Sequence, residues 1–385
     1  MTPTQWQEDL LVLATQLTVR HRNAFHHVSR AAFEKAVATL DRRISSLRDY
    51  EVVVGLQRIA AMIGDGHTRV DASGLYHRLP LELFWFGHEL RVIRTVGAYG
   101  RTLGTRMLSV GEHDLAAVLE RLGALIPQAE NAWFVLHNSA LLLPCAEPLA
   151  ALGILSEPST AAVVFEQEDG TRFELELEPV LPGARLDWLE AWPVAPLHLR
   201  RAEMALWSTF LPDTRTAYAS FRRYDNLADH ARELWERVDN TPVDRLVIDM
   251  RHNGGGNYVH GREHLVHQAQ RRQSVNRAGR LFVVTGRATF SAAMTNATDF
   301  RRETEAILVG EPPGARPNGF QELSRFTLPN SKLDASCSIL HYRFQDGDGP
   351  CVMPDKRIDP DWRTFRAGRD PVMEWIEQRS LDPVA

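Results

Sequence analysis

The first 65 residues of the chain repeat apolar positions at helical spacing. One such stripe is formed by Trp6, Leu10, Leu13 and Leu17. The pattern Thr4-x-x-Gln7 fits a capping box and predicts where the first helix begins. Further helical stripes follow, and the last of them ends in a glycine-rich exit, Gly64-Asp65-Gly66-His67-Thr68. These patterns predict an N-terminal helical segment over residues 1–75.

From about residue 79 the pattern changes to that of short strands. Residues 163–165 and 173–177 alternate in the manner of a hairpin whose turn is Asp169-Gly170. Helical patches interrupt the strands. The pattern predicts a small β-rich middle domain over residues 76–190.

Buried strands and helices alternate in the second half of the chain. The apolar runs lie at residues 246–250, 281–285 and 306–310, and each is short enough for a strand with both faces covered. Such alternation is typical of a layered α/β fold with parallel strands, whose loops gather at the carboxyl ends of the strands. We expect this α/β core to occupy residues 191–385.

Composition and charge exclude several classes of protein. The length of 385 residues predicts two or three domains. The net charge of −5 gives no indication of a surface that binds the phosphates of a nucleic acid. No apolar stretch approaches the roughly 18 residues of a membrane helix, and the first residues, MTPTQWQEDLL, show no basic apolar leader. Three cysteines without C-x-x-C spacing are too few for a disulfide scaffold. We therefore expect a cytoplasmic protein that binds neither nucleic acid nor a membrane.

Two loops of the α/β core would share one edge of its sheet. One loop contains Gly254 and Gly255, whose backbone N–H groups can approach a ligand closely. The other places Ser291 and Ala292 at the start of a helix, where unpaired N–H groups favour an anion. The arrangement predicts a nucleophile, Ser291, beside an oxyanion hole formed by the N–H of Ala292 and that of Gly254 or Gly255. A tight turn and an ordinary helix cap would explain the same residues without chemistry.

A nucleophilic serine needs a base, and His67 is the candidate. It follows a helix in a glycine-flanked turn, and catalytic triads occur in any chain order. Lysine is the other side chain that could serve, but only three of the 44 basic residues are lysine. The remaining ones are arginine, which stays protonated and cannot act as a base. A capping or surface histidine is the alternative interpretation of His67.

Taken together, the motifs resemble the family of tail-specific proteases, C-terminal processing peptidases and the tricorn core protease. The resemblance rests on an ordered set rather than on a single motif. Its members are Gly64-Asp-Gly-His-Thr68, Leu246-Val-Ile-Asp-Met-Arg-His-Asn-Gly-Gly-Gly256, Thr289-Phe-Ser-Ala-Ala293, Val309-Gly-Glu311, Pro354-Asp355 and Gly368-Arg-Asp-Pro371. The resemblance implies a crotonase-like (ClpP-like) α/β core, and the middle domain could be a degenerate PDZ-like domain.

The resemblance also implies which residue is the base. In the tail-specific branch a lysine lies some 25 residues after the serine, but the matching stretch here, residues 310–322, contains none. The chain is therefore similar to the tricorn-like branch, in which a histidine is the base and a distant acid orients it. The nearest matches for that acid are Asp348 and Glu322. An acid is expected there because it orients the imidazole and stabilises its protonated form.

The resulting prediction is a serine peptidase, of the endopeptidase or carboxy-terminal processing type. It would need no cofactor, would act on a peptide or protein substrate, and could be a homo-oligomer. One alternative is a catalytically inactive peptide-binding member of the same fold, and ester or acyl-CoA chemistry on the same core is another. A third is a zinc hydrolase, because His260-Gly-Arg-Glu-His264 matches H-x-x-E-H.

Overall fold

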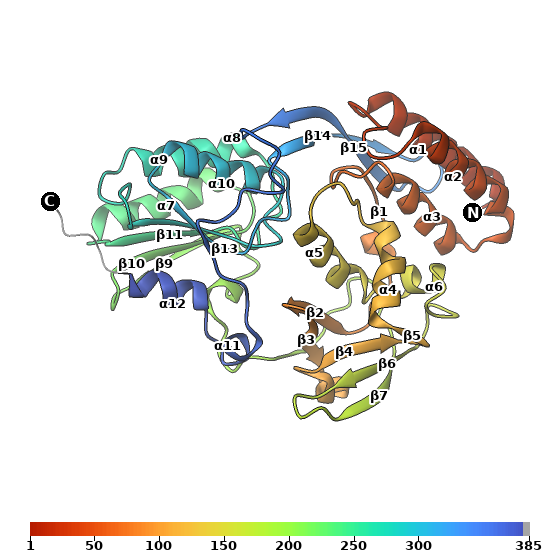
Figure 1. The fold of residues 1–385 in the computed structure, drawn as a ribbon, viewed down its shortest axis with the longest axis horizontal. Helices are drawn as coiled ribbons and strands as arrows, with labels where there is room; N and C mark the ends of the chain where they lie inside the picture. The colour runs from red at the N-terminus through yellow and green to blue at the C-terminus, as the bar shows by residue number, and fades with distance from the viewer. Residues whose placement is uncertain (380–385) are drawn as a thin grey trace. The chain divides into compact units, whose positions relative to one another are not determined.

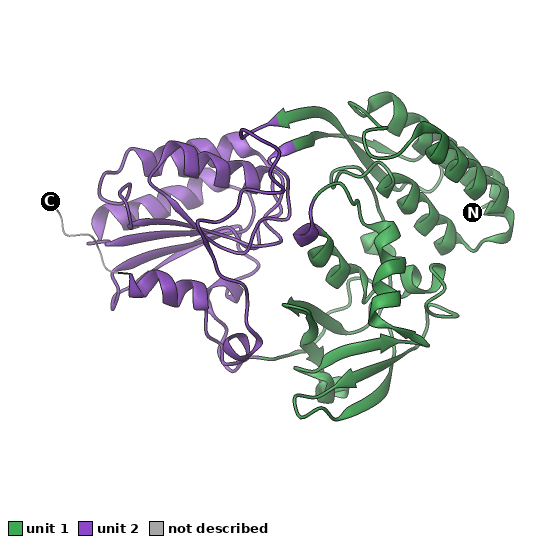
Figure 2. Cartoon of the chain, in the orientation of Figure 1, with its two compact units in different colours: residues 1–130, 135–191, 319–342 green, residues 131–134, 192–318, 343–385 purple. Residues whose placement is uncertain are grey.

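The computed structural model describes residues 1–379 and groups the chain into two compact units. Unit 1 comprises residues 1–130, 135–191 and 319–342. Unit 2 comprises residues 131–134, 192–318 and the chain from residue 343 onwards (Figure 2). The three predicted domains stay a prediction, and each unit is described by itself. No helix in the part that the structure describes is long and apolar enough to cross a membrane.

Unit 1 begins with the predicted helices, α1 (Pro3–Arg20), α2 (Arg30–Arg43) and α3 (Asp49–Ala61). Their apolar stripes meet in one core, which includes Leu10, Leu13, Leu17, Phe33, Leu56 and Ile63. The predicted capping box is wrong by two residues, since the pair is Thr2 and Gln5. Pro3 explains the difference, because proline is favoured at the first helical position, where no N–H is needed.

The β-rich part of unit 1 is an antiparallel sheet with the path β2-β3-β4-β6-β7, in which β5 also pairs with β4 and β8 with β3. The predicted hairpin is confirmed, since β6 and β7 pair from Ala161↔Leu177 to Glu166↔Arg172. The strands are β2 (Leu81–Phe86), β3 (Glu89–Val96), β4 (Arg106–Val110), β5 (His113–Asp114), β6 (Ala161–Glu166), β7 (Arg172–Leu177) and β8 (Trp188–Glu190). The helices are α4 (Leu115–Leu122), α5 (Ala132–Leu142), whose first residues belong to unit 2, and α6 (Ala146–Ala151).

A hairpin from late in the chain completes unit 1. Strands β14 (Asn318–Thr327) and β15 (Asp334–Arg343) form a three-stranded sheet with β1 (Arg69–Asp71), in the order β1-β15-β14. Strand β1 follows His67 directly and pairs with β15 in the register Arg69↔Ser336. This hairpin falls within residues 191–385, the range predicted for the α/β core, and no local pattern in the sequence distinguishes it from the rest of that range.

Unit 2 is built on a six-stranded sheet in the order β16-β13-β12-β11-β10-β9. All neighbours are parallel except β9 and β10, so the predicted parallel pairing is confirmed. The strands are β9 (Leu206–Leu211), β10 (Thr216–Phe221), β11 (Arg245–Asp249), β12 (Leu281–Thr285), β13 (Ile307–Gly310) and β16 (Lys356–Arg357). The helices are α7 (Leu227–Asn240), α8 (Tyr258–Gly261), α9 (His267–Gln270), α10 (Ala292–Glu303), α11 (Trp362–Arg366) and α12 (Pro371–Gln378), with a π-helical turn at Arg262–Val266 between α8 and α9.

Alternate residues of the central strands face opposite sides of this sheet. Ile248 and Val283 pack with Leu234 of α7 and Phe300 of α10, whereas Val247 packs on the other side. That second side is covered by α12, so the unit has three layers (Figure 1). The predicted α/β class is therefore confirmed, while a crotonase-like core stays a prediction. The layers bring the loops that follow β11 and β12 to the same edge of the sheet.

Candidate active site

Ser291 lies on a strained turn between strand β12 and helix α10. It is the N-cap of α10, as predicted, and its backbone has φ 52° and ψ −126°. Non-glycine residues with positive φ normally have ψ of about 30–60°, so this conformation lies outside the left-handed helical region. Such strain costs on the order of 1–3 kcal/mol and persists only where the surroundings impose it. A serine on a sharp strand-to-helix turn is the geometry that exposes a nucleophile.

Hydrogen bonds tie the turn to the loop after β11. The Thr289 hydroxyl donates to the Met250 carbonyl at 2.8 Å and accepts from the Gly286 N–H at 3.0 Å. The Phe290 N–H donates to the Asn253 carbonyl at 3.0 Å. The two loops are therefore joined immediately before Ser291, and this junction is what can impose the strained conformation.

The glycine loop touches Ser291 at Gly255. Gly255 has a φ of +107°, and a Cβ atom built there would lie 2.7 Å from the Ser291 Cβ and 3.0 Å from the Phe290 carbonyl oxygen. No side chain fits at that distance, and a positive φ disfavours any residue except glycine. The structure thus brings together two of the predicted site residues, Ser291 and Gly255, by close approach of bare backbone.

The N–H groups of this region divide into engaged and available ones. The Gly255 N–H, one of the predicted oxyanion donors, donates at 2.9 Å to the side-chain oxygen of Asn253, which closes a tight turn. Neither the Gly254 N–H nor the Ala292 N–H has an acceptor within residues 1–379. Ala292 is the first residue of α10, where N–H groups have no partner inside the helix. Ala292 and Gly254 are therefore the predicted donors that remain available.

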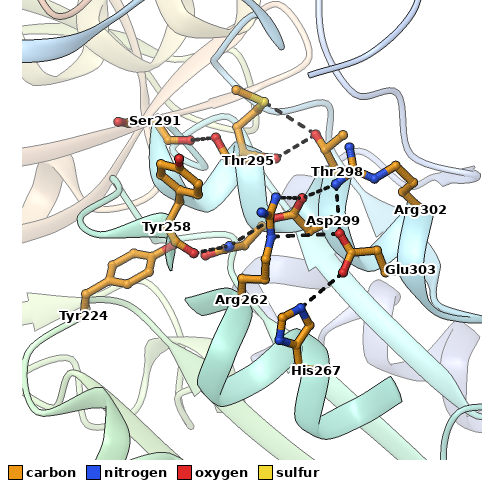
Figure 3. Close-up of polar contacts among 12 residues, drawn as sticks. Tyr224, Tyr258, Arg262, His267, Ser291, Thr295, Thr298, Asp299, Arg302 and Glu303 are labelled. Atoms are coloured by element: carbon orange, nitrogen blue, oxygen red, sulfur yellow. Dashed lines mark hydrogen bonds and ion pairs between the residues drawn. The ribbon is translucent and has the colours of Figure 1, made fainter. Parts of the chain in front are cut away.

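Behind Ser291, helix α10 carries a buried polar network (Figure 3). The Asn296 side chain accepts from the Tyr224 hydroxyl at 2.6 Å and donates to the Tyr258 carbonyl at 2.9 Å. Tyr224 in turn lies so close to Gly256 that a Cβ atom there would meet its ring at 2.4 Å. One turn further along, the Asp299 carboxylate is paired with Arg262. The network connects the end of the glycine loop to the helix that begins at Ser291, and no motif in the sequence indicates it.

His67 lies in unit 1, in the turn between α3 and β1, and its side chain is buried. The Ser336 hydroxyl donates to its backbone carbonyl at 2.8 Å. Burial lowers the pKa of the His67 imidazole to about 4, against the opposing effects of the Asp65 charge and a hydrogen bond to the backbone of Phe320. The imidazole is consequently neutral at pH 7, which is the form that can accept a proton.

The two acids predicted to orient His67 are both exposed. Glu322 lies on β14 in unit 1, where its carboxylate accepts from the Tyr342 hydroxyl at 3.2 Å. Asp348 lies in unit 2, in the segment between β15 and β16. Their roles stay predictions. Within unit 1 the structure adds a buried acid that the sequence interpretation missed, Asp65, two residues before His67. Its position inside the glycine-rich motif was the available signal.

The histidines of the zinc alternative are not arranged as ligands of one metal ion. The rings of His260 and His264 are 6.1 Å apart, and His267 instead lies 3.5 Å from the Glu303 carboxylate. Among residues 1–379, no group of three or more His, Cys, Asp or Glu side chains could hold a metal ion. Nothing in this geometry favours metal-assisted hydrolysis.

Comparison with known proteins yields structural relatives only. No family model and no curated protein matches the sequence. Mature CPAF aligns with a TM-score of 0.59 at 13% identity, covering 98% of this chain and 96% of that chain, and a CPAF point mutant aligns with a TM-score of 0.65 at 12% identity, covering 100% and 99%. Tricorn protease aligns less well, with a TM-score of 0.46 at 12% identity over 97% of this chain and 36% of that chain. The predicted resemblance is confirmed, and at identities this low the likeness to CPAF shows a shared fold alone.

Proposed function

We propose that this protein is a serine peptidase that hydrolyses peptide bonds through an acyl-enzyme on Ser291. The observation that carries the proposal is the strained backbone of Ser291, with Gly255 pressed against it and the Ala292 N–H unpaired beside it. An ordinary helix cap needs no such strain, because a serine caps a helix from unstrained extended backbone. The fold likeness to CPAF and the ordered motifs of the sequence support the same conclusion.

In the proposed reaction, the Ser291 hydroxyl oxygen attacks the scissile carbonyl carbon while His67 accepts its proton. The N–H groups of Ala292 and Gly254 stabilise the resulting oxyanion. The Gly255 N–H can join them once it leaves Asn253. The peptide C–N bond then breaks, and the amine departs with the proton from His67. Water, deprotonated in turn by His67, hydrolyses the ester and restores Ser291.

The substrate we propose is an extended peptide or protein segment, cut in the cytoplasm internally or near its carboxyl end. An extended peptide can bind by adding a strand to an exposed sheet edge. Strand β14 is the last strand of its sheet and so offers one. The two modes of cleavage, internal and terminal, and a homo-oligomeric state are parts of this proposal.

A fluorophosphonate probe tests the proposal, because it phosphonylates serines that are activated as nucleophiles. We expect the folded wild-type protein to gain one adduct by intact mass, Ser291→Ala to gain none, and His67→Ala to react at least about a hundredfold more slowly. Ser208→Ala, which removes a hydroxyl on β9 in the same unit as Ser291, should label like the wild type. A folded wild-type protein that gains no adduct and cleaves no peptide would show that the protein is not a peptidase of this kind.

A further inference from the structure

The turn that carries His67 is built around a buried carboxylate, that of Asp65. Four hydrogen bonds converge on it. Its Oδ1 accepts from the Ser338 hydroxyl at 2.6 Å and from the His67 backbone N–H at 3.1 Å. Its Oδ2 accepts from the Thr68 hydroxyl at 2.8 Å and from the His21 Nε2 at 2.9 Å. Asp65 therefore joins α1, the His67 turn and β15, all within unit 1.

The His21 imidazole donates to Asp65 without carrying a positive charge. Its other ring nitrogen, Nδ1, accepts the backbone N–H of Asn23 at 2.9 Å. A nitrogen that accepts a hydrogen bond holds no proton, so His21 is the neutral tautomer with its one proton on Nε2. The contact between His21 and Asp65 is consequently a hydrogen bond to a carboxylate rather than an ion pair.

All four donors to Asp65 are thus neutral, while the carboxylate itself is ionised. Burial raises its pKa, but the groups that donate hydrogen bonds to it, His21 first among them, outweigh this and leave the pKa of Asp65 below its ordinary value. A buried charge usually has a charged partner as well as hydrogen bonds. Asp65 has the hydrogen bonds, and no cation is among its hydrogen-bond donors.

Other titratable groups lie near this turn, and the His27 ring packs against Gly64. Burial lowers the pKa of His26 and raises the pKa of the Cys337 thiol to about 11, so both are neutral at pH 7. Arg69 lowers the pKa of His67, but its side chain is exposed and water screens its charge. Glu130 accepts from the Gly66 N–H at 3.0 Å and adds negative charge.

We propose that Asp65 is a positioning residue for His67: it fixes the backbone of the turn and holds an unbalanced negative charge that is neutralised when the imidazole takes up a proton. This inference rests on the proposed role of His67 as base. It gives Asp65 the stabilising task that the resemblance implies for Asp348 or Glu322. It also explains why a carboxylate is buried among neutral donors, because the compensating cation exists only during the reaction.

The charge state of His21 can be measured on the wild-type protein. Nitrogen NMR of histidine-labelled protein distinguishes the two neutral tautomers from the protonated ring, and His21→Gln assigns the signal. We expect the neutral form with its proton on Nε2, because Nδ1 accepts the Asn23 N–H. A His21 ring protonated on both nitrogens at pH 7 would overturn the proposal, because Asp65 would then already have its cation. This result does not depend on whether the protein is a peptidase.

The effect on His67 is tested by Asp65→Asn, with Asp9→Asn as the matched control. Asp9 is also a buried acceptor in unit 1, bound by the backbone N–H groups of Asn330 and Ser331 at 2.9 and 2.8 Å. We expect Asp65→Asn to slow fluorophosphonate labelling about tenfold at pH 7 and to move the acid limb of its pH profile about one unit lower. Asp9→Asn should lose stability without changing either quantity. An unchanged acid limb in folded Asp65→Asn would refute the inference while leaving the peptidase proposal intact.

Should Asp65→Asn fail to fold, His21→Gln gives a second test. Glutamine can donate one hydrogen bond to Asp65 and carries no charge, so the acid limb should stay where it is in the wild type. An upward shift of the limb would mean that a cation had been removed, which contradicts a neutral His21.

If the wild-type protein does not label at all, the proposed function fails, and the inference is decided by NMR titration of His67, whose pKa should be lower in Asp65→Asn.

Discussion

The two regions that carry the predicted nucleophile and the predicted base are constructed differently. Around Ser291 the backbone sets the geometry, through a strained turn, a glycine without room for a side chain and the first N–H of a helix. Around His67 side chains set it, through the hydrogen bonds that converge on Asp65. The difference predicts that the Ser291 region is sensitive to a single methyl group and the His67 region to charge and pH.

The largest effect is expected from adding one methyl group to the glycine loop. In Gly255→Ala the new Cβ would lie 2.7 Å from the Ser291 Cβ, so the two loops must separate. A displacement of this size at the reacting atoms costs on the order of a hundredfold in rate. Fluorophosphonate labelling rates, together with a melting curve to confirm folding, measure it.

Gly279→Ala is the matched control for that substitution. Gly279 also has a positive φ, +74°, but an added Cβ would meet nothing within 4 Å. It should lose about 1–2 kcal/mol of stability through backbone strain and keep its labelling rate. Equal rates in Gly255→Ala and the wild type would mean that the contact between the loops is not part of the active site.

The His67 region should respond to pH instead. Because the folded pKa of His67 is about 4 and its unfolded pKa about 6.5, the unfolded chain binds a proton that the folded protein does not between those values. The wild type therefore loses stability as the pH falls from 6.5 to 4, and His67→Asn should be spared that loss, which amounts to about 3 kcal/mol. Denaturant unfolding at several pH values measures the two slopes, and parallel slopes would contradict a buried neutral His67.

A smaller effect is expected from the polar network behind Ser291. Tyr224→Phe removes the hydroxyl that donates to Asn296 and leaves a buried acceptor unpaired, which should cost about 1–3 kcal/mol. Tyr342→Phe removes a hydroxyl whose acceptor, Glu322, is exposed, and should cost less than about 0.5 kcal/mol. Chemical denaturation of both variants measures the loss in the free energy of unfolding. Equal losses would show that the network stabilises unit 2 no more than an exposed hydrogen bond would.

The smallest effect is expected at the histidines of the H-x-x-E-H match. His260 is exposed, so His260→Ala should change stability by less than about 0.5 kcal/mol and leave fluorophosphonate labelling as it is. Labelling should also be unaffected by a strong chelator. A variant or a chelated protein that loses all hydrolysis would instead support the zinc alternative.

The same contrast explains what could be predicted from the sequence. Strands β11, β12 and β13 and the helix start at Ser291 were predicted because each is a local pattern. The close approach of Gly255 followed from the glycine run, although the bond from its N–H to Asn253 did not. These features depend on residues that are neighbours along the chain.

The rest depends on residues that meet only in the fold. His21 and Ser338 both reach Asp65, yet they lie 44 and 273 positions away from it, and no periodicity connects them. Pairing of β1 with β15 is what brings Ser338 to the turn, and that pairing was not predicted. The strain at Ser291 was not predicted either, because the residue type of a serine does not indicate its φ and ψ.

The central proposal is that His67 accepts the proton of the Ser291 hydroxyl. A crystal structure of the phosphonylated protein tests it most directly. We predict one adduct, on the Ser291 oxygen, with a phosphonyl oxygen accepting from the Ala292 N–H. The His67 imidazole should lie within about 3 Å of the Ser291 oxygen or of the position of the leaving group. An adduct on another residue, or a labelled Ser291 with His67 far from it, would contradict the account.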